Sequence, residues 1–280
     1  MIEFEYTGKP TPLSKVVTSR YPQISYSHLR ALLRKKDVVV DGVRVKEDVK
    51  VNSGVVVRLY TTVYSKEDYV YKVDTVYEDQ NIFIFNKPKG LETEGEISLV
   101  SFAKRSCPTA QAVHRLDVNT DGLIIVAKDE NIANLFISEI KNRRIEKHYV
   151  CAVLGCTSGK KRLESYLKKD TDKAKVEIYD KKVDGSVKII TEYTTLKTYP
   201  DYSVLDVNLI TGRTHQIRAH LSHVGHPVLG DGKYSTREIN DKFSFKKQAL
   251  TSYKLIFHTE GSLSYLNGKT FCIDSPLLEF

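Results

Sequence analysis

Short apolar runs that are separated by turn signals, and not by regularly alternating helices, most constrain the fold of this chain. Such runs occupy residues 82–85, 123–127, 149–154 and 202–209. In the last run, Leu205, Val207 and Leu209 alternate with Asp206 and Asn208, as in a strand with one buried face. Parallel strands need long crossover connections, and no regular β-α-β alternation is present. The pattern therefore predicts an α+β fold class with a mixed, largely antiparallel central sheet flanked by helices and loops.

Two helices are predicted between these strands. Asp129 can cap the first helix, whose apolar positions share one face: Ile132, Leu135, Phe136 and Ile140. The second helix follows a turn at Gly212 and is predicted to have Thr214 as its cap. Three of its apolar residues would then face the core, namely Ile217, Leu221 and Val224, with the polar residues projecting elsewhere.

The first 60 residues have a different pattern and form a unit of their own. One short helix is predicted after Pro12, with Leu13, Val16 and Val17 on one face, and a second contains Leu29, Leu32 and Leu33. Residues 38–45 are predicted to form a tight hairpin, because Asp41-Gly42 supplies the two positive-φ residues of a type I′ turn. A further strand is expected at 55–59.

Basic residues are frequent in this first unit: Arg30, Arg34, Lys35, Lys36, Arg44 and Lys46. Such residues often form only a solvated face. However, the order of helix, helix, basic end and Val-Asp-Gly-Val hairpin resembles the small α-L RNA-binding module first described in a ribosomal small-subunit protein. The resemblance covers about residues 11–60 and implies that these cations bind RNA. We therefore expect an α-L RNA-binding domain at 1–62, a linker at 63–74 and a second domain at 75–280.

The overall charge favours an anionic partner. Lys and Arg number 43 against 35 Asp and Glu, so the formal net charge is +8, and nucleic acid is the first candidate. No apolar run approaches the roughly 20 residues of a membrane span, and the first residues, MIEFEYTGKP, lack the pattern of a secretory signal. Four Cys are too few for a disulfide scaffold. We therefore expect buried, reduced thiols, a cytoplasmic location and no membrane partner.

Two segments could carry chemistry. Residues 114–123 (HRLDVNTDGL) place Asp117 in a loop ahead of a buried strand, two residues after a cation. The alternative is an ordinary turn, because Asp and Asn bond their own backbone. Residues 211–221 (TGRTHQIRAHL) place the long donors of Arg213, Gln216 and Arg218 at the start of a helix, where they could bind phosphate or carboxylate. Here the alternative is a helix with a solvated basic face.

A cluster of histidines is the third candidate: His215, His220, His223 and His226. Imidazole is the commonest metal ligand in proteins. The i, i+4 histidine pair with an intervening Glu is absent, and no acidic residue follows until Asp231. The sequence therefore predicts no metal site, and a metal-dependent hydrolase is kept only as an alternative.

Taken together, HRLDVNTDGL and GRTHQIRAHLSHVGHPVLGD closely resemble the RluA-type family of RNA pseudouridine synthases. The similarity begins at Asn86-Lys87-Pro88-Lys89-Gly90-Leu91 and extends over about two-thirds of the chain. An α-L-like module is a common companion of this family. The resemblance implies the pseudouridine synthase fold and an isomerase that detaches uracil from ribose, rotates it and rejoins it through C5. Because the atoms are only rearranged, no cofactor and no metal is expected.

The resemblance also implies roles for individual residues. Asp117 matches the family's catalytic aspartate, Arg218 its basic partner and Tyr149 its active-site tyrosine. We expect a salt bridge between Arg218 and Asp117, and an Arg218→Ala variant that folds but turns over poorly. Arg115 would fill the space left by the extruded uridine. The other substrate-binding candidates are His114, Leu116, Thr120, Arg213, Gln216 and Ile217.

Three segments depart from the family pattern. Asp121 stands where a serine often follows the motif threonine, Glu92-Thr93-Glu94-Gly95 replaces a valine-histidine element, and Leu250-Thr251-Ser252 stands where Leu-His-Ala is common. Large-subunit ribosomal RNA is the expected substrate, with transfer RNA as the alternative, and no obligate protein partner is evident. A catalytically silent RNA-binding or ribosome-assembly factor is the alternative of another class, and the presence of the three catalytic candidates disfavours it.

Overall fold

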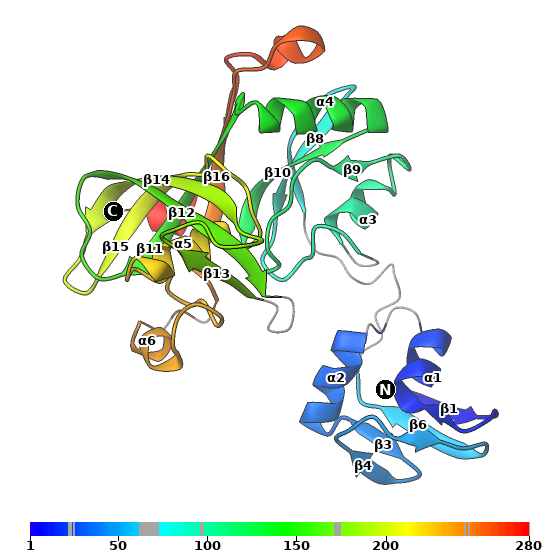
Figure 1. Ribbon diagram of the computed structural model, residues 1–280. Helices are drawn as coiled ribbons and strands as arrows, with labels where there is room; N and C mark the ends of the chain where they lie inside the picture. The colour runs from blue at the N-terminus through cyan, green and yellow to red at the C-terminus, as the bar shows by residue number, and fades with distance from the viewer. Residues whose placement is uncertain are drawn as a thin grey trace. The chain divides into compact units, whose positions relative to one another are not determined.

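The computed structural model describes residues 1–21, 24, 26–61, 73–95, 98–170, 175–243, 245 and 247–279. The chain divides into two compact units, Met1–Val70 and Tyr71–Phe280, and the first is the blue part of Figure 1. The predicted linker at 63–74 lies outside the described residues except for its last two positions. Of these, Asp74 already belongs to a strand of the second unit.

The first unit is a four-stranded antiparallel sheet with two helices. The sheet has the order β1-β6-β3-β4, formed by β1 (Ile2–Tyr6), β6 (Val55–Leu59), β3 (Val38–Val40) and β4 (Val43–Val45). The predicted helices are present as α1 (Leu13–Arg20) and α2 (Tyr26–Lys35), and a short pair joins β2 (Thr11–Pro12) to β5 (Lys50–Val51). The predicted type I′ hairpin is confirmed, because Asp41 and Gly42 have φ of 47° and 81°.

The second unit is built on one large sheet. Its order is β13-β12-β14-β15-β11-β16-β10-β8-β7, with β17 beside β16 and β9 beside β10. The strands are β7 (Asp74–Glu78), β8 (Ile82–Lys87), β9 (Gln111–Ala112), β10 (Asp121–Ala127), β11 (Ile145–Leu154), β12 (Lys160–Asp170), β13 (Lys175–Tyr179), β14 (Val187–Thr198), β15 (Tyr202–Asn208), β16 (Leu250–Phe257) and β17 (Thr270–Cys272). In the described strands, β10 and β16 run parallel and the other pairs antiparallel. The predicted mixed, largely antiparallel sheet is confirmed.

Helical segments cover both faces of this sheet. They are α3 (Leu99–Ala103), α4 (Glu130–Lys141), α5 (Gln216–His223), α6 (Arg237–Lys242), η1 (Gly261–Leu266) and η2 (Pro276–Leu278). Side chains alternate between faces along a strand, so Ile82 and Ile84 of β8 pack with α4 and η1. Phe83 and Phe85 pack in the opposite cluster, to which α3 and α5 contribute. In Figure 1, α4 lies across β8 and β10. The three candidates Leu116, Tyr149 and Ile217 all belong to the cluster beneath α5.

The two predicted helices of this unit differ from expectation in detail. Asp129 caps α4, since its Oδ1 accepts the amide hydrogen of Ile132 at 2.9 Å. Leu135, which the spacing places on the apolar face of this helix, is nevertheless 39% exposed. The cap of α5 is His215, at φ 54°, and not Thr214. Val224 is exposed, whereas Gln216 and Arg218 are buried. The helix therefore turns its polar first turn inward, which apolar periodicity does not predict.

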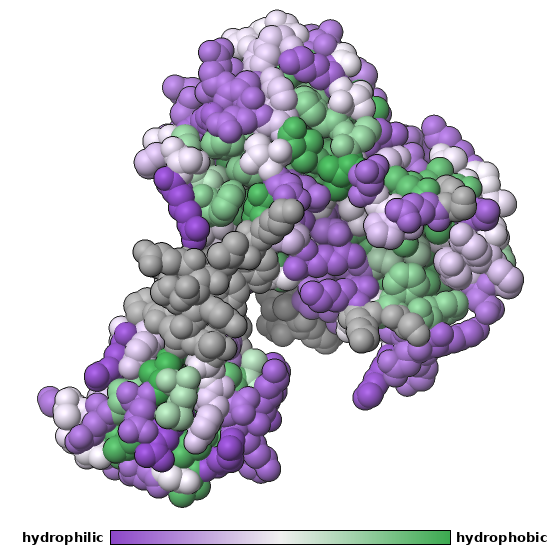
Figure 2. Space-filling model, turned by 180° about the vertical axis from the view of Figure 1, so that it is seen from behind, coloured by the Kyte–Doolittle hydropathy of each residue, from purple (hydrophilic) through white to green (hydrophobic). Residues whose placement is uncertain are grey.

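The surface shown in Figure 2 is largely hydrophilic, and most of the thiols are at least partly exposed. Among the described residues, no helix is long and apolar enough to cross a membrane. Hydrophilic residues cover much of the face drawn in Figure 2, and hydrophobic residues form separate patches between them. All four cysteines are free, as expected, but only Cys151 is buried, whereas Cys107 is half-buried and Cys156 and Cys272 are exposed. The expectation of four buried thiols was wrong.

Candidate active site

The loop that carries Asp117 is fixed by hydrogen bonds on both sides of the carboxylate. The hydroxyl of Thr93 donates to the carbonyl of Leu116 at 3.0 Å and accepts its amide hydrogen at 3.2 Å. The amide of Thr120 donates to the carbonyl of Asp117 at 3.0 Å and closes a turn. The buried Thr120 hydroxyl accepts a hydrogen bond from Gln248. The loop therefore holds Asp117 in one place. In the sequence, Thr93 stands out only as part of a departure from the family pattern, and nothing there indicates the role of Gln248.

The turn that follows β8 is hydrogen-bonded to this loop and helps to fix its position. Lys87 is fully buried, and its Nζ donates to the carbonyls of Leu91 at 2.8 Å and Pro88 at 3.1 Å. The amide of Gly90 donates to the carbonyl of Val118 at 2.7 Å, which joins this turn to the Asp117 loop. The resemblance to the family begins at this segment, and its hydrogen bonds connect it to the loop that carries Asp117.

A glycine permits the close approach of β10 and β16 beside the site. Gly122 has φ 110°, and a Cβ at this position would lie 2.1 Å from the carbonyl oxygen of Ser252. No other residue fits this space without moving backbone. This close approach positions two parts of the site. The Asp117 loop comes directly before β10, and β16 begins at Leu250, which lines the pocket beside Asp117.

Two of the departures from the family pattern touch each other at this point. The Thr251 hydroxyl donates to Oδ1 of Asp121 at 2.8 Å, and Nζ of Lys89 lies 3.6 Å from the same oxygen. Asp121 is therefore paired with Thr251 and Lys89 and does not line the pocket beside Asp117. The third departure contains Thr93, whose hydroxyl fixes the backbone of Leu116.

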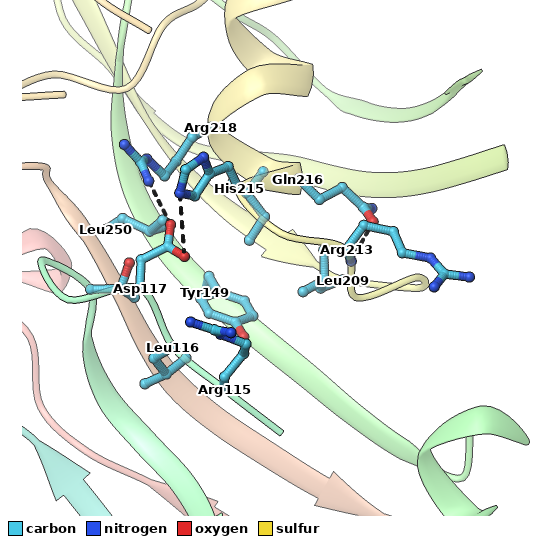
Figure 3. A pocket seen from close by; sticks show the side chains of 12 residues that line it. Arg115, Leu116, Asp117, Tyr149, Leu209, Arg213, His215, Gln216, Arg218 and Leu250 are labelled. Carbon is cyan, nitrogen blue, oxygen red and sulfur yellow. Dashed lines mark hydrogen bonds and ion pairs between the residues drawn. The ribbon is translucent and has the colours of Figure 1, made fainter. Parts of the chain in front are cut away.

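An ion-pair chain runs from Asp117 into the protein interior. Nη1 of Arg218 donates to Oδ2 of Asp117 at 2.6 Å, which is the predicted salt bridge (Figure 3). The other edge of the guanidinium binds Asp231 in a bidentate pair, with Nε to Oδ2 at 2.7 Å and Nη2 to Oδ1 at 2.9 Å. Asp231 is fully buried. Burial alone would raise the pKa of Asp231, but its hydrogen bonds to Arg218 hold that pKa below the usual value.

His215 and Tyr234 complete the surroundings of the carboxylate. Nε2 of His215 lies 4.0 Å from Oδ1 of Asp117, and its Nδ1 lies 3.0 Å from the Tyr234 hydroxyl. That hydroxyl also accepts the amide hydrogen of Val176 at 2.9 Å, so β13 is tied to the start of α5. Burial lowers the pKa of His215. The sequence pattern indicated His215 only as a possible metal ligand.

The pocket beside Asp117 has an apolar wall and a polar rim. Its lining consists of Arg115, Leu116, Asp117, Thr120, Tyr149, Leu209, Arg213, His215, Gln216, Ile217, Arg218 and Leu250. Tyr149 is 4% exposed, and burial raises its pKa, which keeps the hydroxyl protonated as a donor. In Figure 3, Arg218 and His215 point toward Asp117, whereas Arg213 points away from it.

All predicted substrate-binding residues except His114 line this pocket, although two of them have their polar groups engaged within the protein. The Gln216 amide accepts from Thr211 and donates to Thr191 and to the Ile190 carbonyl. It therefore holds the turn before α5. The Thr120 hydroxyl is similarly bonded to Gln248.

His114 faces a neighbouring groove and has a structural partner. Its Nε2 accepts the amide hydrogen of Ile125 at 3.1 Å, which requires the unprotonated nitrogen. Burial lowers the pKa of His114 to about 3. Its neutral ring stabilises the start of the Asp117 loop against β10, and His114 lines the groove beside the pocket instead of the pocket itself. Its role in binding substrate stays a prediction.

The low pKa of His114 predicts acid sensitivity of the larger unit. A histidine with an ordinary pKa of 6.5 when unfolded and about 3 when folded binds its proton more readily in the unfolded state. Stability is therefore present above pH 6.5 and falls as the pH drops toward 3. Buried His220, with a pKa lowered to about 4, acts in the same direction. Urea unfolding at pH 7 and pH 5 measures this loss.

The matched variant is His114→Gln, whose side-chain oxygen can still accept from Ile125 but does not titrate in this range. We expect it to lose less stability between the two pH values than the unaltered chain. An equal loss in both proteins would contradict a contribution from His114.

The remaining histidines do not converge on one point. Nδ1 of His220 lies 2.9 Å from the Thr191 hydroxyl, Nε2 of His223 lies 2.8 Å from Asp180, and Nδ1 of His226 lies 2.9 Å from the Leu154 carbonyl. Among the residues that the structure describes, no three His, Cys, Asp or Glu side chains form a group that could hold a metal ion. Each histidine of the cluster has a separate partner.

The predicted RNA-binding cations of the first unit are all exposed: Arg30, Arg34, Lys35, Lys36, Arg44 and Lys46. They lie on α2, on β4 and in the segments that follow these elements. Nη1 of Arg44 donates to the carbonyl of Lys36 at 2.5 Å, and its guanidinium lies over the Tyr60 ring. Their role in binding RNA stays a prediction.

Comparison with known proteins identifies the family of the second unit. The family model described as RNA pseudouridylate synthase matches residues 81–223. Ribosomal large subunit pseudouridine synthase D of Xylella fastidiosa is 29% identical over 234 residues, which cover 78% of this chain and 70% of that protein. An RNA pseudouridine synthase of Aquifex aeolicus is 30% identical over 262 residues, 84% of this chain and 80% of that protein.

The fold agrees with solved structures as well. The structure of human RNA Pseudouridylate Synthase Domain Containing 1 superposes with a TM-score of 0.62 at 22% identity, and covers 77% of this chain and 87% of that chain. Human RNA Pseudouridylate Synthase Domain Containing 4 gives a TM-score of 0.58 at 20% identity, over 72% and 88% of the two chains. The predicted fold is thereby confirmed.

Proposed function

Because the chain belongs to the RNA pseudouridylate synthase family, we propose that the pocket around Asp117 isomerises specific uridines in large-subunit ribosomal RNA. The choice of RNA is supported by the names of several relatives, which are ribosomal large subunit pseudouridine synthases. We further propose that the reaction takes place in the cytoplasm. The observation that carries the proposal is Asp117 at 2.6 Å from the buried Arg218, on the wall of a pocket that Tyr149 also lines.

The reaction breaks the bond between N1 of uracil and C1′ of ribose and forms a bond between C5 and C1′. N1 gains a proton and C5 loses one, so atoms and electrons balance without an external reagent. In our proposal the Asp117 carboxylate acts on the nucleotide, and Arg218 holds it in place. The apolar wall around Leu116 and Ile217 would hold the freed base. Extruding the uridine costs roughly a few kcal/mol of unstacking, and Arg115 is the proposed support for the vacated space.

The first unit would bring the chain to its RNA. We propose that it is an α-L RNA-binding domain and that the exposed cations of α2 and β4 contact phosphates. This assignment rests on the resemblance of its pattern and on the exposure of those cations.

Mapping pseudouridines in total RNA from cells with and without the gene tests the proposal. We expect at least one site in large-subunit ribosomal RNA to disappear without the gene and to return when the gene is restored. If only a site in transfer RNA disappears, the substrate is transfer RNA and not ribosomal RNA. Unchanged maps together with impaired ribosome assembly would favour a non-catalytic assembly factor.

Tyr149 has a flat ring and a buried hydroxyl, and a Tyr149→Phe variant separates the two. The ring should still pack against the base, but the proton donor is lost. We expect turnover to fall by about 10² to 10³, with little change in RNA affinity. Single-turnover measurement of pseudouridine formation gives the rate, and filter binding gives the affinity. A variant with normal turnover would restrict Tyr149 to packing.

A further inference from the structure

A second buried lysine lies two residues before Tyr149 and lacks the partners that such a group needs. Lys147 is 6% exposed and occupies β11, where alternation places it on the same face as Tyr149. Among the described residues, its ammonium group makes no hydrogen bond and no ion pair, and its charge helps to lower the pKa of His114. Burial lowers its pKa to about 8, and no carboxylate offsets that effect.

Comparison with Lys87 shows that this fold can satisfy a buried ammonium group when it is structural. The Nζ of Lys87 donates to backbone carbonyls on two sides of its turn. Lys147 has no such arrangement, although burying an unpaired charge destabilises a protein. The Lys147 nitrogen is not one of the described polar atoms that are fully enclosed without a partner, so it reaches the groove that Lys147 lines. Its hydrogens are therefore left to solvent or to a ligand in that groove.

The ammonium group of Lys147 opens into a basic groove that adjoins the reaction pocket. The groove shares Asp117 and Tyr149 with that pocket and continues to the end of α4. Its exposed cations are Arg115, Lys141, Arg143 and Arg213. Among its described lining residues, Asp117 is the single acid. An elongated anion that leaves the reaction pocket would thus meet cations along this side.

Arg143 provides a second, independent observation at the rim of the groove. It has φ 59° and occupies the left-handed position after α4. The amide of Arg143 donates to Ile140, and that of Arg144 donates to Glu139, as in a Schellman cap. Glycine is the usual residue at this position, because a side chain there strains the backbone. An arginine is present despite that cost, and its exposed side chain lines the groove.

We propose that Lys147 forms the floor, and Arg143 the rim, of a subsite that binds a backbone phosphate of a nucleotide next to the target uridine. The proposal rests on the proposed function for the nature of the anion. A phosphodiester supplies the acceptor oxygens that the Lys147 ammonium lacks, and it brings the negative charge that four exposed cations attract. The flipped uridine and its neighbouring phosphate would then occupy the pocket and the groove at the same time.

The salt dependence of RNA binding tests whether Lys147 contacts a phosphate. For the full chain and a short oligouridylate, we expect Lys147→Met to reduce the slope of log affinity against log salt by about 0.7, the value for one phosphate contact on a single strand. The matched control is Lys161→Met, an exposed lysine of β12 with the same charge change, which should leave the slope unchanged. Equal slopes in the unaltered chain and Lys147→Met would overturn the proposal.

A stability measurement shows whether Lys147→Met binds RNA more weakly only because it is unfolded. Because Lys147→Met removes an unpaired buried charge, we expect its melting temperature to rise while its RNA affinity falls. A melting temperature that falls would show that the ammonium group stabilises the fold, and would also overturn the proposal.

Arg143→Gly tests the rim with a residue suited to the left-handed cap. We expect α4 to keep or gain stability and the slope to fall by about 0.7 again. Lysine acylation followed by mass spectrometry adds a direct readout. Oligouridylate should protect Lys147 and leave Lys161 reactive. Protection by inorganic phosphate at equal ionic strength, without protection by oligouridylate, would show an ion site unrelated to RNA.

Pseudouridine formation, measured in the same preparations, separates the two hypotheses. If the unaltered chain forms no pseudouridine in any ribosomal or transfer RNA, the proposed function fails, whatever the slopes are. If it forms pseudouridine and the slope of Lys147→Met is unchanged, the subsite alone fails.

Discussion

Replacing Asp117 by Asn is expected to reduce pseudouridine formation by roughly 10³-fold or more, as is common when a reacting group is removed. The amide keeps the shape of the side chain but cannot serve as a carboxylate toward the nucleotide. Folding should survive, because Arg218 stays paired with the buried Asp231. The loop is also held by the Thr93 hydroxyl, which donates to the carbonyl of Leu116, and by the Thr120 amide, which donates to the carbonyl of Asp117. Single-turnover assays on the RNA identified by mapping measure the loss.

The control is Asp129→Asn, which makes the same charge change at the N-cap of α4, away from the pocket. Asn caps helices about as well as Asp, so this variant should keep both folding and turnover. If Asp117→Asn retained turnover within a few fold of the unaltered chain, Asp117 could not be the reacting carboxylate, and the acid would have to be sought elsewhere.

The sheet could be predicted because strand signals are local. The run at 82–85 and the alternation at 202–209 need only a few residues to be recognised, and both became strands. The parallel pairing of β10 with β16 could not be predicted from such signals. It joins Asp121 to Thr251, residues far apart in the chain, and depends on the close approach that Gly122 permits.

The residues of the site also fall into those that the sequence predicted and those that it did not. Asp117 and Arg218 stand in long motifs, so the resemblance identified both, and the expected salt bridge is present. Asp231 was passed over because a lone acid in a loop has no periodicity and is usually exposed. A signal was available in principle: a buried arginine with one partner needs further acceptors. That reasoning requires the burial of Arg218, which the apolar pattern of α5 does not reveal.

The burial of Asp231 changes what is expected of Arg218→Ala. The sequence suggested a folded variant with poor turnover. In the structure, removing the guanidinium leaves a fully buried carboxylate without its bidentate partner. Breaking a buried ion pair in this way typically costs about 3–5 kcal/mol. We therefore expect Arg218→Ala to lose stability on this scale in urea unfolding, as well as turnover.

A double variant distinguishes the structural from the catalytic role of this arginine. In Arg218→Met with Asp231→Leu, both charges are replaced by apolar groups, so no buried charge is left unpaired, and most of the stability should return. Turnover should not return, because Asp117 still lacks its cation. Recovery of turnover together with stability would mean that Arg218 serves only the fold. Failure to recover stability would mean that the fold also needs the hydrogen bonds that Oδ1 of Asp231 accepts from the amides of Lys233 and Tyr234.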